Sequence, residues 1–160
     1  MPYYRHIIFI LLNILPLYRH KMLYLLYCYN MHMKYAVIVK KIKNKGRGVF
    51  ATKIFSTSEI IEKCPVIVLS KKDAKLTQQT FLDNYLYDWD HYHKSCLPLG
   101  YGLIYNHSYQ PNARYYFDHV KNFIIYKAIK NIKKGQEITV NYNFDPHDTS
   151  STGIEGVPTI

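Results

Sequence analysis

The segment Leu99–Asn112 places the strongest constraint on what this chain can fold into. Gly100 and Gly102 open it, the triplet Asn106–Ser108 follows, and Pro111 stands just before its end. Glycine has no Cβ, so its backbone can approach a ligand or another backbone segment closely. An isolated Asn-His-Ser would indicate a capped turn, but the flanking glycines and proline argue against an ordinary turn. We therefore expect a loop that packs against a ligand or another part of the chain.

Most of the remaining chain consists of short β-type runs separated by turn residues. Lys71–His93 differs, because its apolar residues show mixed helical spacing and predict one or two short helices followed by a loop. Pro65 is expected to separate two of the strands. Short strands with little helix predict a mostly-β domain. The strands Ala113–Asp118 and Asn122–Ile129 are expected to form a hairpin. The other expected strands are Tyr35–Val39, Val49–Ala51, Glu59–Lys63, Val66–Leu69 and Glu137–Tyr142.

The chain is basic, with 21 Lys and Arg against 11 Asp and Glu and a formal net charge of +10. Such an excess favours acidic partners: nucleic acid, an anionic membrane or an acidic protein. An equally simple explanation is that the charge serves solubility and reflects an AT-rich coding bias, which makes lysine abundant. We favour this second interpretation, because no compact basic cluster stands out beyond short pairs such as those at 40–41 and 133–134. The length of 160 residues fits one domain.

Residues 1–32 are apolar but interrupted by charges. Neither apolar run reaches the length of about 18 residues that a membrane span needs. A signal peptide is disfavoured because no small-x-small cleavage site follows the apolar run. We favour the interpretation that translation starts later than Met1, at Met31 or Met33. The second interpretation is that residues 1–32 form a weak anchor at a membrane interface. Membrane association is thus disfavoured.

The cysteines and histidines do not form a metal motif. Cys28, Cys64 and Cys96 are isolated, and the absence of a C-x-x-C pair disfavours a zinc site. A sparse, odd count fits a reducing, intracellular compartment, cytoplasmic or nuclear, or delivery into a host cell. Four histidines have no metal-ligand spacing, and we interpret them as surface loop residues: His91, His93, His119 and His147.

Three segments in this order resemble the SET-domain protein-lysine methyltransferases, in particular the small, stand-alone members. They are Lys45–Ala51, Leu99–Asn112 and Gly135–Tyr142. The resemblance runs from about Lys43 to Asp145. It implies a SET fold of small curved β-sheets, with a C-terminal segment threaded under the Asn-His-Ser loop as a pseudoknot. We expect a SET domain at 33–146, an N-terminal extension at 1–32 that is separate from it, and a polar tail at 147–160.

The resemblance implies S-adenosylmethionine-dependent methyl transfer to a protein lysine side chain. Such a transfer needs an in-line arrangement of donor and acceptor, oxygen acceptors around the methyl group and an unprotonated amine, but no metal. The partner is then a protein with an exposed lysine. The cofactor-binding residues carried over from the family are Gly46, Arg47, Gly48, Asn106, His107 and Tyr142.

Tyr142 is the expected catalytic residue, because it closes the strand where the family has its tyrosine. Tyr85 and Tyr105 are candidate walls of the lysine channel, and packing in the core is an equally good interpretation in a chain with 17 tyrosines. Tyr115 and Val140 occupy the channel positions at which the family limits the number of methyl groups. Their combination resembles the monomethylating arrangement, and core packing is again the alternative.

One departure from the family concerns the aromatic residue that closes the cofactor pocket. The last aromatic here is Phe144, and the residues after Asp145 contain none. Either Phe144 serves this role, or the chain is truncated or weakly active. The alternative function is therefore an inactive SET scaffold that acts as a basic module binding protein or nucleic acid.

Overall fold

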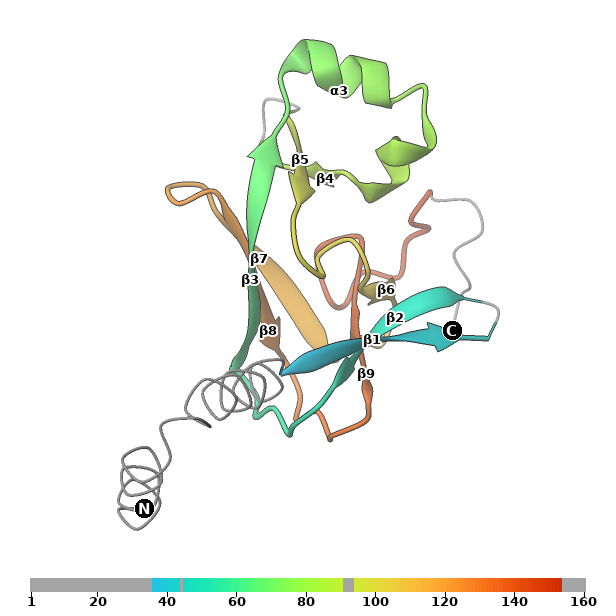
Figure 1. Ribbon diagram of the computed structural model, residues 1–160, viewed down its shortest axis with the longest axis vertical. Helices are drawn as coiled ribbons and strands as arrows, with labels where there is room; N and C mark the ends of the chain where they lie inside the picture. The colour runs from blue at the N-terminus through green and yellow to red at the C-terminus, as the bar shows by residue number, and fades with distance from the viewer. Residues whose placement is uncertain (1–35, 44, 91–93, 154–160) are drawn as a thin grey trace, which may run out of the picture. The chain divides into compact units, whose positions relative to one another are not determined.

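The computed structural model describes residues 36–43, 45–90 and 94–153. Residues 1–32, expected to form an extension, lie outside the described residues. Two sheets dominate, with strand orders β1-β2-β9-β6 and β4-β5-β3-β8-β7 (Figure 1). The mostly-β expectation is confirmed. The strands are β1 Val37–Ile42, β2 Gly46–Ala51, β3 Ile60–Val68, β4 Tyr87–Asp88, β5 Ser95–Pro98, β6 Asn106–His107, β7 Ala113–Asp118, β8 Phe123–Ala128 and β9 Glu137–Val140.

The C-terminal strand β9 lies in the interior of the first sheet. It pairs with β2 in antiparallel fashion through Val49 and Phe50, and with β6 in parallel fashion through Asn106 and His107. The last strand of the chain is thus inserted between two elements that precede it by many residues. This threading is the arrangement that the expected pseudoknot requires.

The second sheet contains one expectation that is wrong. Pro65 does not divide two strands, because β3 runs continuously from Ile60 to Val68. Pro65 lies where β3 changes partners: residues up to Pro65 pair with β8, and residues from Val66 pair with β5. The Pro65 carbonyl accepts a hydrogen bond from the Leu99 N–H at 2.8 Å. A residue without an N–H is tolerated here because the ladder is already interrupted.

The region after β3 contains the expected short helices. The α-helix α3 spans Lys71–Thr77, and the Ser70 side chain caps its first turn by accepting from the Asp73 N–H. The 3₁₀ helix η2 spans Phe81–Tyr85. The expected loop after them contains the short strand β4, and its partner β5 follows the end of that segment. None of the helices in the described residues is long and apolar enough to cross a membrane.

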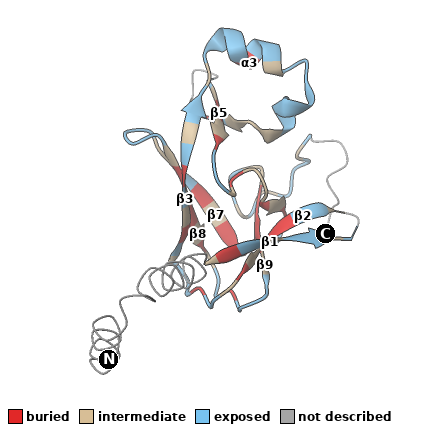
Figure 2. Cartoon of the chain, viewed as in Figure 1, coloured by how far each residue is buried: buried red, intermediate tan, exposed pale blue. Residues whose placement is uncertain are grey.

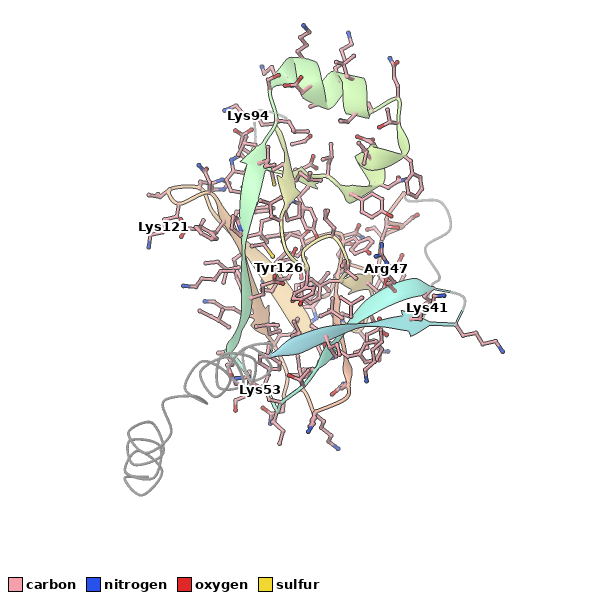
Figure 3. The ribbon with its side chains drawn as sticks, viewed as in Figure 1. Lys41, Arg47, Lys53, Lys94, Lys121 and Tyr126 are labelled. Carbon is pink, nitrogen blue, oxygen red and sulfur yellow. The ribbon has the colours of Figure 1, made fainter. Side chains whose placement is uncertain are left out.

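The core lies between the two sheets, and exposed residues concentrate on α3, η2 and the hairpin ends (Figure 2). Tyr126, at the centre of the molecule, is fully buried (Figure 3), and its hydroxyl lies 3.1 Å from the Tyr87 hydroxyl. Two buried free cysteines, Cys64 and Cys96, pack there as small apolar groups. The largest fully buried side chains are Tyr105, Tyr126, Phe55, Ile124, Ile132, Ile138, Val49 and Val140.

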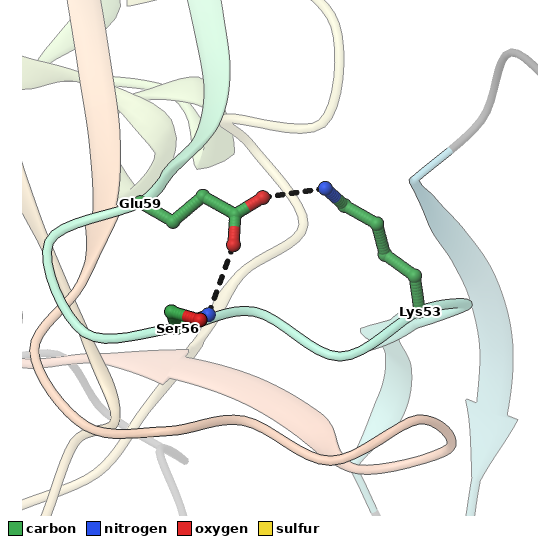
Figure 4. A network of polar contacts seen from close by, with 3 residues as sticks. All are labelled: Lys53, Ser56 and Glu59. Atoms are coloured by element: carbon green, nitrogen blue, oxygen red, sulfur yellow. Dashed lines mark hydrogen bonds and ion pairs between the residues drawn. The ribbon is translucent and has the colours of Figure 1, made fainter.

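A surface contact braces the connection between β2 and β3. The Lys53 ammonium forms an ion pair with the Glu59 carboxylate, whose second oxygen accepts from the Ser56 N–H at 2.9 Å (Figure 4). These two bonds lower the pKa of Glu59, with the Lys53 bond the larger cause. The connection between β2 and β3 is thereby fixed, at the end of the described domain that lies away from α3, as the position of Lys53 in Figure 3 shows.

Candidate active site

A cavity of about 1090 Å³ lies between β4, η2 and the residues that follow β9. Its wall is predominantly aromatic, and its acidic groups are Asp88 and Asp90. Among the described residues, no lysine or arginine lines it, although the chain is strongly basic. Aromatic faces suit a hydrocarbon stem that ends in an amine. The aromatic lining residues are Tyr85, Tyr87, Trp89, Tyr105, Tyr115, Phe117, Tyr142 and Phe144.

Tyr142 enters this cavity from the end of β9. Its hydroxyl donates to the Tyr105 carbonyl oxygen at 2.9 Å, and its backbone N–H donates to Nδ1 of His107 at 3.2 Å. Burial raises the pKa of Tyr142 to about 12, so the hydroxyl keeps its proton at neutral pH. The parallel pairing of β6 with β9 brings these three residues together. The phenol is thus held in one position as a neutral hydrogen-bonding group.

A glutamate that the sequence analysis missed supports this arrangement. Glu62 Oε2 accepts from the Tyr105 hydroxyl at 3.0 Å, and Oε1 accepts from the Tyr101 N–H at 3.1 Å. The backbone reaches the carboxylate at Gly100, where φ is +76° and an added Cβ would stand 2.5 Å from Oε1. Glu62 therefore fixes Tyr105, whose carbonyl fixes Tyr142. A carboxylate within a largely apolar strand was the signal that could have revealed it.

The four expected channel residues do not share one environment. Tyr85 and Tyr105 line the cavity, and Tyr105 is also buried, with its ring stacked on Tyr126 at 4.4 Å. Tyr115 lines the cavity and donates its hydroxyl proton to the Tyr142 carbonyl at 3.2 Å. Val140 is fully buried in the core and is not among the lining residues.

Phe144 lies at the cavity wall after a backbone turn with φ of +69°. Its ring stacks on Phe117 at 5.9 Å and meets Tyr115 edge-on at 5.4 Å. The guanidinium carbon of Arg114 lies 4.7 Å from the ring centre. The last aromatic residue of the chain therefore belongs to the aromatic wall of the cavity.

Of the six expected cofactor residues, Arg47, Gly48, Asn106 and His107 gather at the junction of β2, β6 and β9, outside the lining of this cavity, whereas Tyr142 lines the cavity. The Asn106 amide nitrogen donates to the Arg47 carbonyl at 3.0 Å and to Glu137 Oε1 at 2.7 Å. A Cβ on Gly48 would stand 2.8 Å from that amide nitrogen. Gly46 lies apart, at the start of β2, with open space around it.

His107 is 3% exposed, and its Nε2 has no hydrogen-bond partner among the described residues. Burial lowers the pKa of its imidazole, so the ring is neutral. Of the other histidines, His119 packs against Trp89 and Phe117 at the cavity, while His91 and His93 lie outside the described residues. The described part of the chain contains no group of His, Cys, Asp and Glu that could hold a metal ion.

Comparison with known proteins decides the family. A model of the SET domain matches residues 46–143. The chain belongs to the SET-domain family. It is accordingly a protein-lysine N-methyltransferase, and the expected fold and enzyme class are confirmed. This SET domain is 34% identical over 105 residues to a Schizosaccharomyces pombe protein named histone-lysine N-methyltransferase, H3 lysine-37 specific, covering 65% of this chain and 71% of that protein.

A solved structure shows the same fold. The crystal structure of a candidate histone methyltransferase from Plasmodium falciparum superposes with a TM-score of 0.56 at 33% sequence identity. The match covers 68% of this chain and 98% of that one. The SET fold of this chain thus extends over nearly the whole length of a solved relative.

Proposed function

We propose that this SET domain transfers a methyl group from S-adenosylmethionine to a lysine of a histone. The observation that carries the proposal is the Tyr142 hydroxyl, held protonated in an aromatic cavity by the Tyr105 carbonyl. The printed names of both relatives support a histone as the protein substrate. A histone substrate places the enzyme in the nucleus or cytoplasm. The comparisons give no support to the alternative of a scaffold without turnover.

The junction around Asn106 fits the cofactor. Because Gly48 has no side chain, its backbone approaches Asn106 more closely than a residue with a Cβ could, since an added Cβ would stand 2.8 Å from the amide nitrogen. The Asn106 side chain carries both a donor and an acceptor, the pair of groups that a zwitterionic amino-acid group needs. The orphaned Nε2 of His107 is a second polar atom available there. The cofactor, when bound, supplies an electrophilic methyl group. Arg47, Gly48, Asn106 and His107 would hold it.

The cavity fits the lysine. Its aromatic wall excludes water and favours the neutral amine over the ammonium form, because burial disfavours charge. Tyr142 orients the reacting groups through its hydroxyl oxygen without ionising. The hydroxyl of Tyr115, directed at the Tyr142 carbonyl, occupies space near the same centre. We therefore expect a monomethyl product.

The test is the variant Tyr142→Phe, which keeps the ring and removes the hydroxyl. Methyl transfer to histones from labelled cofactor, read by mass spectrometry, should fall by about 100-fold or more, because a preorganised polar group at the reacting atoms is lost. Cofactor binding by calorimetry should stay close to that of the unmodified chain.

The matched control is Tyr116→Phe, which removes the hydroxyl of a tyrosine that is 37% exposed on β7. It should retain full activity. Full activity in Tyr142→Phe would contradict the catalytic assignment, and a trimethylated product would contradict the expected product.

A further inference from the structure

The β1–β2 hairpin gathers basic residues that look scattered in the sequence. Residues 40–47 contain five of the chain's 21 Lys and Arg and no acidic residue. Lys41 and Arg47 face each other directly across the two strands, and Lys43 and Lys45 lie in the turn between them. Figure 3 shows Lys41 and Arg47 together on this hairpin, whereas the labelled Lys53, Lys94 and Lys121 belong to other parts of the fold.

The hairpin end also extends beyond the rest of its sheet. Backbone pairing between β2 and β9 involves only Val49 and Phe50, whereas β1 and β2 pair as far as Ile42 and Gly46. The end is therefore a two-stranded ribbon. Lys40, Lys41, Lys43 and Arg47 are exposed, and Lys45 is half-buried.

Within the part of the chain that the structure describes, these cations form no ion pair with an acidic residue. The ion pairs among the described residues are Lys53–Glu59 and Lys94–Asp90, and neither involves the hairpin. Like charges directly opposite each other on paired strands destabilise the pairing. The Lys41–Arg47 pair thus lowers stability in the isolated protein, and an external anion would relieve the repulsion.

We propose that the β1–β2 hairpin end is a binding surface for the phosphate backbone of duplex DNA. A two-stranded β-ribbon has the size that the major groove admits, and lysine and arginine side chains provide the phosphate contacts. An acidic protein partner would call for an aromatic or apolar centre in the interface, and a membrane would call for inserting apolar side chains. Residues 40–47 contain no aromatic residue, and their one large apolar side chain, Ile42, is half-buried.

The test compares two triple variants of equal charge change. Lys41→Gln/Lys43→Gln/Lys45→Gln neutralises the hairpin, and Lys71→Gln/Lys72→Gln/Lys75→Gln neutralises three exposed lysines of α3. Affinity for a fluorescent DNA duplex, measured by anisotropy over a salt series, should fall about 10-fold or more in the hairpin variant only. Its slope of log affinity against log salt should decrease by about 2 to 3, because each phosphate contact contributes about 0.9.

A second measurement uses the unmodified chain, so it does not depend on the variant folding. Bound duplex should protect Lys41, Lys43 and Lys45 from acetylation, read by mass spectrometry, and leave Lys71, Lys72 and Lys75 reactive. Equal losses in both triple variants, equal protection of both lysine sets, or absence of duplex binding at low salt would overturn the proposal. Stronger binding to polyglutamate or to anionic vesicles than to the duplex would also overturn it.

Discussion

Glu62 is the residue on which the geometry of the site depends without touching the reacting atoms. The variant Glu62→Gln keeps the shape of the side chain but removes the carboxylate that accepts from Tyr105 and Tyr101. We expect kcat to fall while KM changes little, because Tyr142 loses its fixed support through Tyr105. Stability should fall by about 1–3 kcal/mol, the range for a buried hydrogen-bonding group left without its partner.

The matched control for Glu62 is Glu59→Gln, which removes a surface carboxylate just before the start of β3 (Figure 4). It should leave kcat unchanged and the urea midpoint nearly so, since exposed ion pairs contribute little. Steady-state kinetics separates the two roles. A Glu62→Gln variant with raised KM and normal kcat would show that Glu62 supports substrate binding instead.

His107 makes stability depend on pH. Burial lowers the pKa of the folded imidazole below the ordinary value of 6.5, so the unfolded chain binds more protons between the two values. The free energy of unfolding should be constant above about pH 6.5 and should fall as the pH decreases through this window, by at most about 1.4 kcal/mol per pH unit. Urea unfolding at several pH values measures this, and His107→Gln should flatten the dependence. An unchanged slope in the variant would assign the acid sensitivity to other groups.

At the scale of elements, Asn112 ties β9 into the centre of its sheet. Its amide donates to the Glu137 carbonyl at 2.8 Å, and its oxygen accepts from the Thr139 N–H at 3.0 Å. Asn112→Ala should destabilise the fold by about 2–4 kcal/mol in urea unfolding, because two backbone groups lose their partner. Gln110→Ala, at an exposed position two residues earlier, is the control and should be close to neutral. Equal stability of both variants would mean that β9 is held by its strand pairing alone.

The elements show what a sequence pattern can predict. The strand β9 was predictable because its apolar residues alternate, and the β7–β8 hairpin was predictable because two apolar, aromatic-rich runs flank the turn at 118–121. The two-residue strands β4 and β6 are too short to carry a period, and they exist only because β5 and β9 pair with them. The same distinction applies to the candidate site. The motif around Asn106 could be recognised in the sequence, whereas the contact of Glu62 with Tyr105 could not, because it joins residues far apart in the sequence. Likewise, Lys41 and Arg47 come to lie opposite each other only because of the register in which β1 and β2 pair.

At the scale of the whole molecule, the domain boundaries remain predictions. The SET match begins at residue 46, and the two sheets and their core lie within the described residues 36–153. A shortened chain that starts at Met33 should therefore melt cooperatively, with a midpoint within about 4 °C of the full chain, a shift that corresponds to 1 kcal/mol or less. Calorimetry or circular dichroism measures the transition. Aggregation, or a broad transition in the shortened chain alone, would place residues 1–32 within the folding unit.

The insertion of β9 between β2 and β6 has a consequence for synthesis on the ribosome. During translation the segments of β1 to β8 emerge first, but the middle of the first sheet stays open until the segment of β9 has left the ribosome. Because β9 borders the Asn106 junction and Tyr142 directly follows β9 and Asn141, the nascent enzyme has no complete site until this segment has emerged. Such late, non-local pairing is slow to form and leaves strand edges exposed in the meantime. Newly made chains therefore need protection from aggregation until β9 has taken its place in the sheet, and the site for methyl transfer is complete only from then on.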